Sequence, residues 1–134
     1  MKKLKCYYAH TMTSYDSTIE EQDIELLEKL NFEVVNPNTE ETQSNVDEYI
    51  KKHGKDKVMD YFGLIIDDCD LVAFRSIPTG EILSGVAFEL NHAYVTDKPI
   101  IELPCSIQKR IWDYPTTKKY LIELGHYKVV ANEK

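Results

Sequence analysis

The chain has 134 residues, of which 43% are hydrophobic and 29% are charged, and this composition is typical of one globular domain. We therefore expect a single domain over residues 1–134 that buries a core without disulfides or metals. With 23 acidic and 16 basic side chains, the formal net charge of −7 argues against binding to a nucleic-acid polymer. A local patch or a helix N-terminus can still bind a small anion.

The three cysteines Cys6, Cys69 and Cys105 are an odd, widely spaced set that fits neither a disulfide framework nor a zinc site. We expect them to be mostly buried thiols in a reducing compartment. The basic start of the chain is followed by too few apolar residues for a signal peptide, and no apolar run approaches the roughly 20 residues of a membrane helix. These patterns predict a cytoplasmic protein with no membrane partner, no metal and no cofactor.

Strand-like and helix-like patterns alternate along the chain, which predicts an α/β fold. Strands are expected at residues 4–9, 32–35, 71–74 and 99–103, with a fifth, edge strand at 127–130. Helices are expected at 17–30, at a segment ending near 53–54, and at 56–67, 84–95 and 116–124. Thr18 and Glu21 have the spacing of a capping box, and Gly54 suits a helix C-terminus. Strands linked by helices in this way are expected to be parallel.

Ligands bind such sheets outside the carboxyl ends of the strands, which directs attention to the residues after 4–9 and 71–74. The first strand ends in YYAHTM at residues 7–12, and the third is followed by Arg75. Glycine-rich dinucleotide and triphosphate motifs are absent. The four histidines lack ligand-like spacing, and the acidic residues at 67–70 fit a solvated turn better than a metal site.

Glu89 lies about one turn inside the helix expected at 84–95, which begins at the ligand-binding edge. Ser84 and Gly85 at its start offer free backbone amides and the positive end of the helix dipole, which suit a phosphate or a hydroxyl. Glu89 shares a helix face with Gly85, so we expect its carboxylate near Tyr7 and Tyr8. There it would be placed to attack an anomeric carbon. The spacing is also that of a solvated helix glutamate.

Four stretches in order along residues 3–103 carry a family pattern: YYAHTM at 7–12, DLVAF at 70–74, SGVAFELNHA at 84–93 and TDKPII at 96–101. They resemble motifs of the nucleoside 2-deoxyribosyltransferase family, which includes deoxynucleoside 5′-monophosphate N-glycosidases. The resemblance implies an α/β three-layer sandwich of flavodoxin/Rossmann-like type with a five-stranded parallel sheet. It also implies cleavage of the N-glycosidic bond of (deoxy)nucleosides or their 5′-monophosphates, followed by hydrolysis or transfer to another base.

In that family mechanism, Glu89 is the nucleophile that forms a glycosyl-enzyme intermediate, and Tyr7 orients it. Ser84 and Gly85 would bind the 5′ end of the sugar or its phosphate. Asp60 would replace the family's helix aspartate, which handles the leaving base, only if the helix register shifts. The other residues expected at the substrate are Tyr8, His10, Thr11, Met12, Phe62 and Arg75. His10 stands where the family has glycine, so it would act as an acid, contact the base or narrow the pocket.

Two other functions remain open. The same residues would suit a module that binds a nucleotide without cleaving it, or an enzyme that hydrolyses the ribosyl bond of a dinucleotide such as NAD. The family also forms dimers or larger assemblies, so we expect a homo-oligomer. Trp112, Tyr114 and Tyr120 suit either an interface or the core of the chain.

Overall fold

The computed structural model describes residues 2–105 and 113–126. Over these residues the chain is an α/β structure with a parallel sheet of four strands, in the order β2-β1-β3-β4. The strands are β1 (Lys5–Ala9), β2 (Glu33–Val35), β3 (Leu71–Arg75) and β4 (Ile100–Leu103). The α-helices are α1 (Thr18–Lys29), α2 (Glu40–His53), α3 (Val58–Asp67), α4 (Ser84–Val95) and α5 (Tyr114–Glu123). The fifth strand expected at 127–130 lies outside the described residues.

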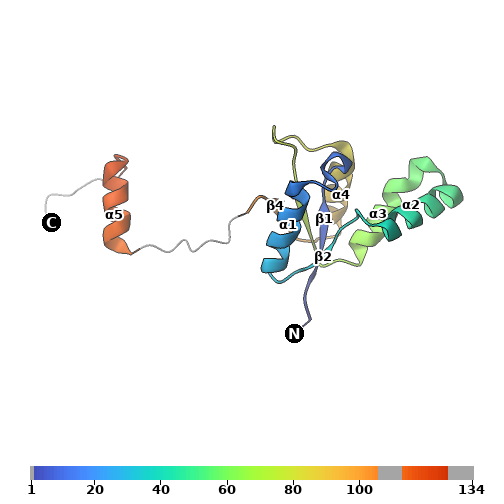
Figure 1. The fold of residues 1–134 in the computed structure, drawn as a ribbon, viewed down its shortest axis with the longest axis horizontal. Helices are drawn as coiled ribbons and strands as arrows, with labels where there is room; N and C mark the ends of the chain where they lie inside the picture. The colour runs from blue at the N-terminus through green and yellow to red at the C-terminus, as the bar shows by residue number, and fades with distance from the viewer. Residues whose placement is uncertain (1, 106–112, 127–134) are drawn as a thin grey trace.

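Helices cover both faces of this sheet. Leu27 of α1 packs on one face against Cys6, Tyr8 and Ala73. On the other face, α3 and α4 pack over β1 and β3 through residues such as Ile66 and Val86. Figure 1 shows α1 on one side of the sheet, α3 and α4 on the other, and α5 apart from both. Because successive strand residues point to opposite faces, β1 contributes Tyr7 and Ala9 to the α3–α4 face, and Cys6 and Tyr8 to the α1 face.

Local sequence signals explain where several helices begin and end. Helix α1 is capped by Ser17, whose hydroxyl accepts a hydrogen bond from the Glu20 amide, so the capping box expected one residue later is not the one used. Gly54 ends α2 with φ +96°, a conformation that side chains rarely adopt, as its position in the sequence predicts. The N-cap residue of α4 is Leu83, which has no side-chain group that accepts a hydrogen bond, so no side chain caps the amides of the first turn.

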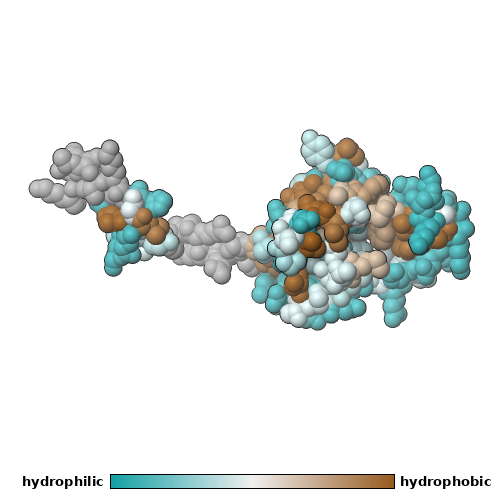
Figure 2. Space-filling view, turned by 90° about the horizontal axis from the view of Figure 1, so that it is seen from above, coloured by the Kyte–Doolittle hydropathy of each residue, from teal (hydrophilic) through white to brown (hydrophobic). Residues whose placement is uncertain are grey.

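The carboxyl ends of β1 and β3 form the topological switch point of the sheet, because the chain leaves β1 toward β2 and returns to β3 on its other side. Figure 2 looks onto this edge of the sheet and shows hydrophobic residues gathered near its centre, with hydrophilic ones over α2. Among the helices described, none has the length and apolar character needed to span a membrane.

Candidate functional site

A pocket of about 420 Å³ lies at the switch point, between the end of β1 and helices α2, α3 and α4. This volume is within the usual range for small-molecule sites. Its lining residues are Tyr7, His10, Thr11, Met12, Tyr15, Pro37, Gln43, Val46, Val58, Met59, Phe62, Leu83, Ser84, Gly85, Val86 and Glu89. The structure thus brings together eight of the eleven site residues expected from the sequence: Tyr7, His10, Thr11, Met12, Phe62, Ser84, Gly85 and Glu89.

A buried pair of side chains forms the polar centre of the pocket. The hydroxyl of Tyr7, from the central strand β1, donates a hydrogen bond to Oε2 of Glu89, from the second turn of α4. Tyr7 is fully buried, and Glu89 is only 6% exposed although it lies in a helix. A glutamate on a helix ordinarily faces water, so its burial beside one hydrogen-bond donor is a costly arrangement of the kind found at functional sites.

Burial controls the protonation of this pair. It raises the pKa of Glu89 from 4.5 to about 7, and the hydrogen bond from Tyr7 opposes that rise. Burial, followed by the nearby charge of Glu89, raises the pKa of Tyr7 well above its usual value, so the phenol remains a donor. Glu89 therefore changes charge near neutral pH while Tyr7 does not.

Tyr15, which follows the short 3-10 helix η1 (Met12–Ser14), is a pocket residue that the sequence reasoning missed. Burial and then the charges of Glu89 and Glu20 raise its pKa to about 12. No local pattern marks Tyr15, because its position depends on how the chain turns between β1 and α1.

The wall opposite β1 is apolar and comes from α2 and α3. Val46 of α2 and Val58, Met59 and Phe62 of α3 line it, together with Gln43 one helical turn before Val46. Of these residues, only Phe62 was expected from the sequence. Residues 43 and 46 lie on one face of a helix, as do residues 58, 59 and 62, so the sequence spacing could have identified the others. An apolar wall with a single amide group suits a flat heterocycle.

The start of α4 forms another side of the pocket. Ser84 and Gly85 both line it, and the first-turn amides there have no side-chain cap. A Cβ added at Gly85 would meet no atom within 4 Å, so the absence of a side chain leaves open space rather than relieving a clash. This end of the pocket offers donors for a hydroxyl or a phosphate group.

His10 lies in the pocket wall with both ring nitrogens engaged. Nδ1 is 3.1 Å from the Tyr8 carbonyl oxygen, and Nε2 is 2.7 Å from Oε2 of Glu20. The ring stacks on Tyr8 at 3.9 Å between centroids and leans against Tyr15 at 4.9 Å. Of the roles expected for His10, this geometry favours the narrowing of the pocket, because neither nitrogen is left for a ligand.

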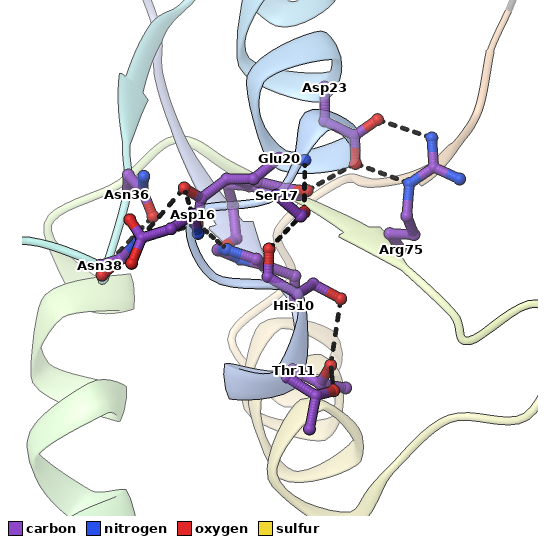
Figure 3. A network of polar contacts seen from close by, with 12 residues as sticks. His10, Thr11, Asp16, Ser17, Glu20, Asp23, Asn36, Asn38 and Arg75 are labelled. Carbon is purple, nitrogen blue, oxygen red and sulfur yellow. Dashed lines mark hydrogen bonds and ion pairs between the residues drawn. The ribbon is translucent and has the colours of Figure 1, made fainter.

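Tyr8 and Arg75, both expected at the substrate, lie outside this pocket. The Tyr8 hydroxyl donates to Asp23 of α1, and Arg75 binds both carboxylate oxygens of Asp23 at 2.6 Å (Figure 3). Tyr8 and Arg75 lie outside the pocket because successive side chains of a strand point to opposite faces of the sheet. Tyr8 and Arg75 point to the α1 face, whereas Tyr7 points to the α4 face. The Tyr8, Asp23 and Arg75 side chains form a partly buried network that supports α1 against the sheet.

Asp60, expected to replace the family's aspartate, is also outside the pocket. It lies in the first turn of α3 and is exposed, about 200° around the helix from Phe62, so Phe62 reaches the pocket and Asp60 does not. The acidic residues at 67–70 do not gather: Asp67 pairs with His92, and Asp70 accepts from the Lys5 amide. Among the described residues, no group of three potential ligands is placed to hold a metal.

Comparison of the chain with family models, with curated proteins and with solved structures finds no match. The functional assignment therefore rests on the pocket itself and on the sequence motifs, of which those at residues 7–12 and 84–93 contribute lining residues.

Proposed function

We propose that the chain cleaves the N-glycosidic bond of (deoxy)nucleosides or nucleoside 5′-monophosphates, with Glu89 as the nucleophile. The observation that carries this proposal is the buried Glu89 carboxylate, which is the sole carboxylate among the described lining residues and is held by Tyr7 through one oxygen. The tyrosine hydrogen bond engages Oε2, which leaves Oε1 as the oxygen for attack. The resemblance of the strand and helix motifs to nucleoside 2-deoxyribosyltransferases adds support from the sequence.

The proposed reaction has two displacements at C1′ of the sugar. Oε1 of ionised Glu89 attacks C1′ while the C1′–N bond breaks, and the base departs with the electron pair and gains a proton. The resulting glycosyl ester is then attacked by water, which restores the carboxylate and consumes one water molecule overall. If another base attacks instead, the reaction is a transfer. Negative charge close to C1′ stabilises the oxocarbenium-like transition state in both steps.

The pocket walls suggest how a nucleoside would lie. The base would contact the apolar wall of Val58, Met59 and Phe62, and the 5′ end of the sugar would face Ser84 and Gly85. This orientation puts the sugar between α4 and β1, where Glu89 and Tyr7 meet. No lysine or arginine is among the lining residues described, so a 5′-phosphate would depend on the α4 amides and Ser84.

A binding module without catalysis is a second candidate, and one observation favours it. Glu89 is the sole carboxylate among the described lining residues, since Asp60 faces solvent. An enzyme of the proposed kind needs a group that delivers a proton to the leaving base. In a cleaving enzyme, Tyr15 or water would have to supply that proton; in a module, none is required.

A nucleoside panel separates the two candidates. The protein is titrated calorimetrically with 2′-deoxynucleosides, ribonucleosides and their 5′-monophosphates, and each mixture is then analysed by mass spectrometry for free base. Release of base by the wild type and not by Glu89→Gln supports the glycosidase, with the exposed Glu81→Gln as matched control. Binding with no release supports the module, and neither binding nor release contradicts both.

The finer features of the fold and assembly belong to this proposal as well. We infer that the fold is a three-layer flavodoxin-like sandwich, and that the chain acts in the cytoplasm as a homo-oligomer. Tyr114 and Tyr120 of α5 are 66% and 46% exposed, which fits an interface better than a core, whereas Trp112 lies outside the described residues. Sedimentation of the full chain measures the oligomeric state.

A further inference from the structure

Glu20 lies in the first turn of α1, does not line the pocket, and is nevertheless only 6% exposed. A glutamate at the start of an isolated helix would face water and interact with the helix dipole. Here its two oxygens are held by partners from three other parts of the chain, as Figure 3 shows. Its burial therefore reflects contacts that α1 itself does not require.

Each partner of Glu20 either lines the pocket or directly follows a residue that does. Oε2 is 2.7 Å from Nε2 of His10, which lines the pocket at the end of β1. Oε1 accepts from the amide of Asp16 at 3.2 Å, directly after the pocket residue Tyr15. Nδ2 of Asn38 donates to both oxygens at 3.1 and 3.2 Å, directly after the pocket residue Pro37.

These contacts join the two ends of the segment that carries Thr11, Met12 and Tyr15. His10 begins this segment and Asp16 ends it, and Asp16 has the unusual φ of +60°. A non-glycine residue at positive φ persists only where its surroundings hold it. The Glu20 carboxylate supplies that support through the Asp16 amide, and it fixes the His10 ring against which Tyr15 leans.

The hydrogen-bond pattern shows what Glu20 must supply. The Tyr8 carbonyl only accepts, so Nδ1 of His10 carries a proton. The Asp16 amide and the Asn38 side chain are both donors, so the Glu20 oxygens act as acceptors toward them. A glutamine could accept from Asp16 and Asn38 at the Oε1 position and donate its amide to an unprotonated Nε2 of His10, and it would lose only the 3.2 Å contact of Asn38 with Oε2. The Glu20→Gln substitution thus removes the charge but keeps most of the hydrogen-bond geometry.

We propose that Glu20 is a positioning residue that joins the β1 end, the Tyr15 turn and the Pro37 loop into one wall, and so holds Tyr15 in the pocket that contains Glu89. The role extends the proposed function, because it explains how a nucleoside pocket is held in shape by a residue that never touches the ligand. It does not depend on catalysis, because the joined segments can be observed in the ligand-free protein.

The test compares Glu20→Ala, Glu20→Gln and the matched control Glu28→Ala, an exposed glutamate of the same helix. Amide hydrogen exchange is measured for residues 10–16 and 36–39 in the full chain without ligand. We expect exchange in both segments to accelerate at least about tenfold in Glu20→Ala, the effect of losing buried hydrogen bonds to a charged group. Glu20→Gln should remain close to the wild type, and Glu28→Ala should match it.

Kinetic measurements with 2′-deoxynucleosides add a second readout. A disordered wall should raise KM for Glu20→Ala more than it lowers kcat, and Glu20→Gln should restore KM. Unchanged exchange in both segments of a folded Glu20→Ala, or a global loss of protection that Glu20→Gln fails to rescue, would overturn the proposal. If the wild type binds nucleosides without cleaving them, the proposed reaction fails while the exchange result still decides the role of Glu20.

Discussion

Tyr7 and Tyr8 are neighbours in β1, yet their hydroxyls donate to carboxylates on opposite faces of the sheet. Tyr7 binds Glu89 of α4 inside the pocket, whereas Tyr8 binds Asp23 of α1, which is also held by Arg75. The two pairs are chemically alike, but only one faces a cavity. Matched variants of Tyr7 and Tyr8 can therefore separate effects on function from effects on stability.

We predict that Tyr7→Phe changes the pH dependence of the reaction and that Tyr8→Phe does not. The Tyr7 hydrogen bond lowers the pKa of Glu89, so its removal raises that pKa above about 7. Because attack requires ionised Glu89, the rising limb of kcat/KM against pH should move to higher pH in Tyr7→Phe. Tyr8→Phe should lose about 1–2 kcal/mol of stability, since it removes a buried hydrogen bond to a charged group, and keep the wild-type profile. Equal profiles for all three proteins would contradict the assignment of Tyr7.

Stability should fall as pH rises through the range where Glu89 ionises. Burial raises the pKa of Glu89 from 4.5 to about 7, so the folded state holds a proton that the unfolded state has released. This contribution is fully present below pH 4.5 and is lost as pH rises past about 7. Its size is about 3 kcal/mol at most.

The matching variant is Glu89→Gln, which keeps the shape and removes the charge. Urea unfolding at several pH values between 4 and 8 should show that the variant gains stability relative to the wild type as pH increases. If the two proteins lose stability in parallel over this range, Glu89 is not the buried titrating group described here.

Gly85→Ala should weaken ligand binding without harming the fold. The added methyl group meets nothing within 4 Å, and alanine favours the helix by up to about 1 kcal/mol over glycine. The methyl group would occupy space that the sugar needs near the start of α4. Calorimetry with nucleosides should give weaker binding, with an unchanged or higher melting temperature. Asn91→Ala on the exposed side of α4 is the control, and unchanged affinity in Gly85→Ala would place the sugar elsewhere.

Arg75→Met should destabilise the chain and leave nucleoside affinity unchanged. Asp23 is 2% exposed, so loss of its bidentate partner leaves a buried charge with only the Tyr8 hydroxyl, at a cost of about 3 kcal/mol. The double variant with Asp23→Asn should recover part of this loss. Affinity is measured below the melting transition. If Arg75→Met is stable but loses nucleoside binding, Arg75 contacts the ligand and the structural role assigned to it is wrong.

Much of the fold was predictable because its signals are local. The bounds of α4 at 84–95 and the glycine end of α2 agree with the prediction, and the four described strands lie where strands were expected. Helix α5 begins at Tyr114, earlier than predicted, because Asp113 caps it through the Thr116 amide. The parallel pairing also followed from the alternation of strands and helices.

The site was predicted less completely because it depends on contacts between distant residues. Motif order was enough to place Glu89 and Tyr7 together, although they are 82 residues apart. Strand alternation already implied that Tyr7 and Tyr8 could not share one pocket, and that signal was not used. The binding of Arg75 to Asp23, 52 residues away, and the contacts of Glu20 with three segments have no local pattern in the sequence.

Base release at pH 8, with Glu89 ionised, tests the central claim most directly. Wild type and Glu89→Gln are incubated with a mixture of nucleosides and their 5′-monophosphates, and free base is quantified by mass spectrometry over time. The account predicts release by the wild type and a loss of at least about a thousandfold in the folded variant. Base release by Glu89→Gln at the wild-type rate would contradict it.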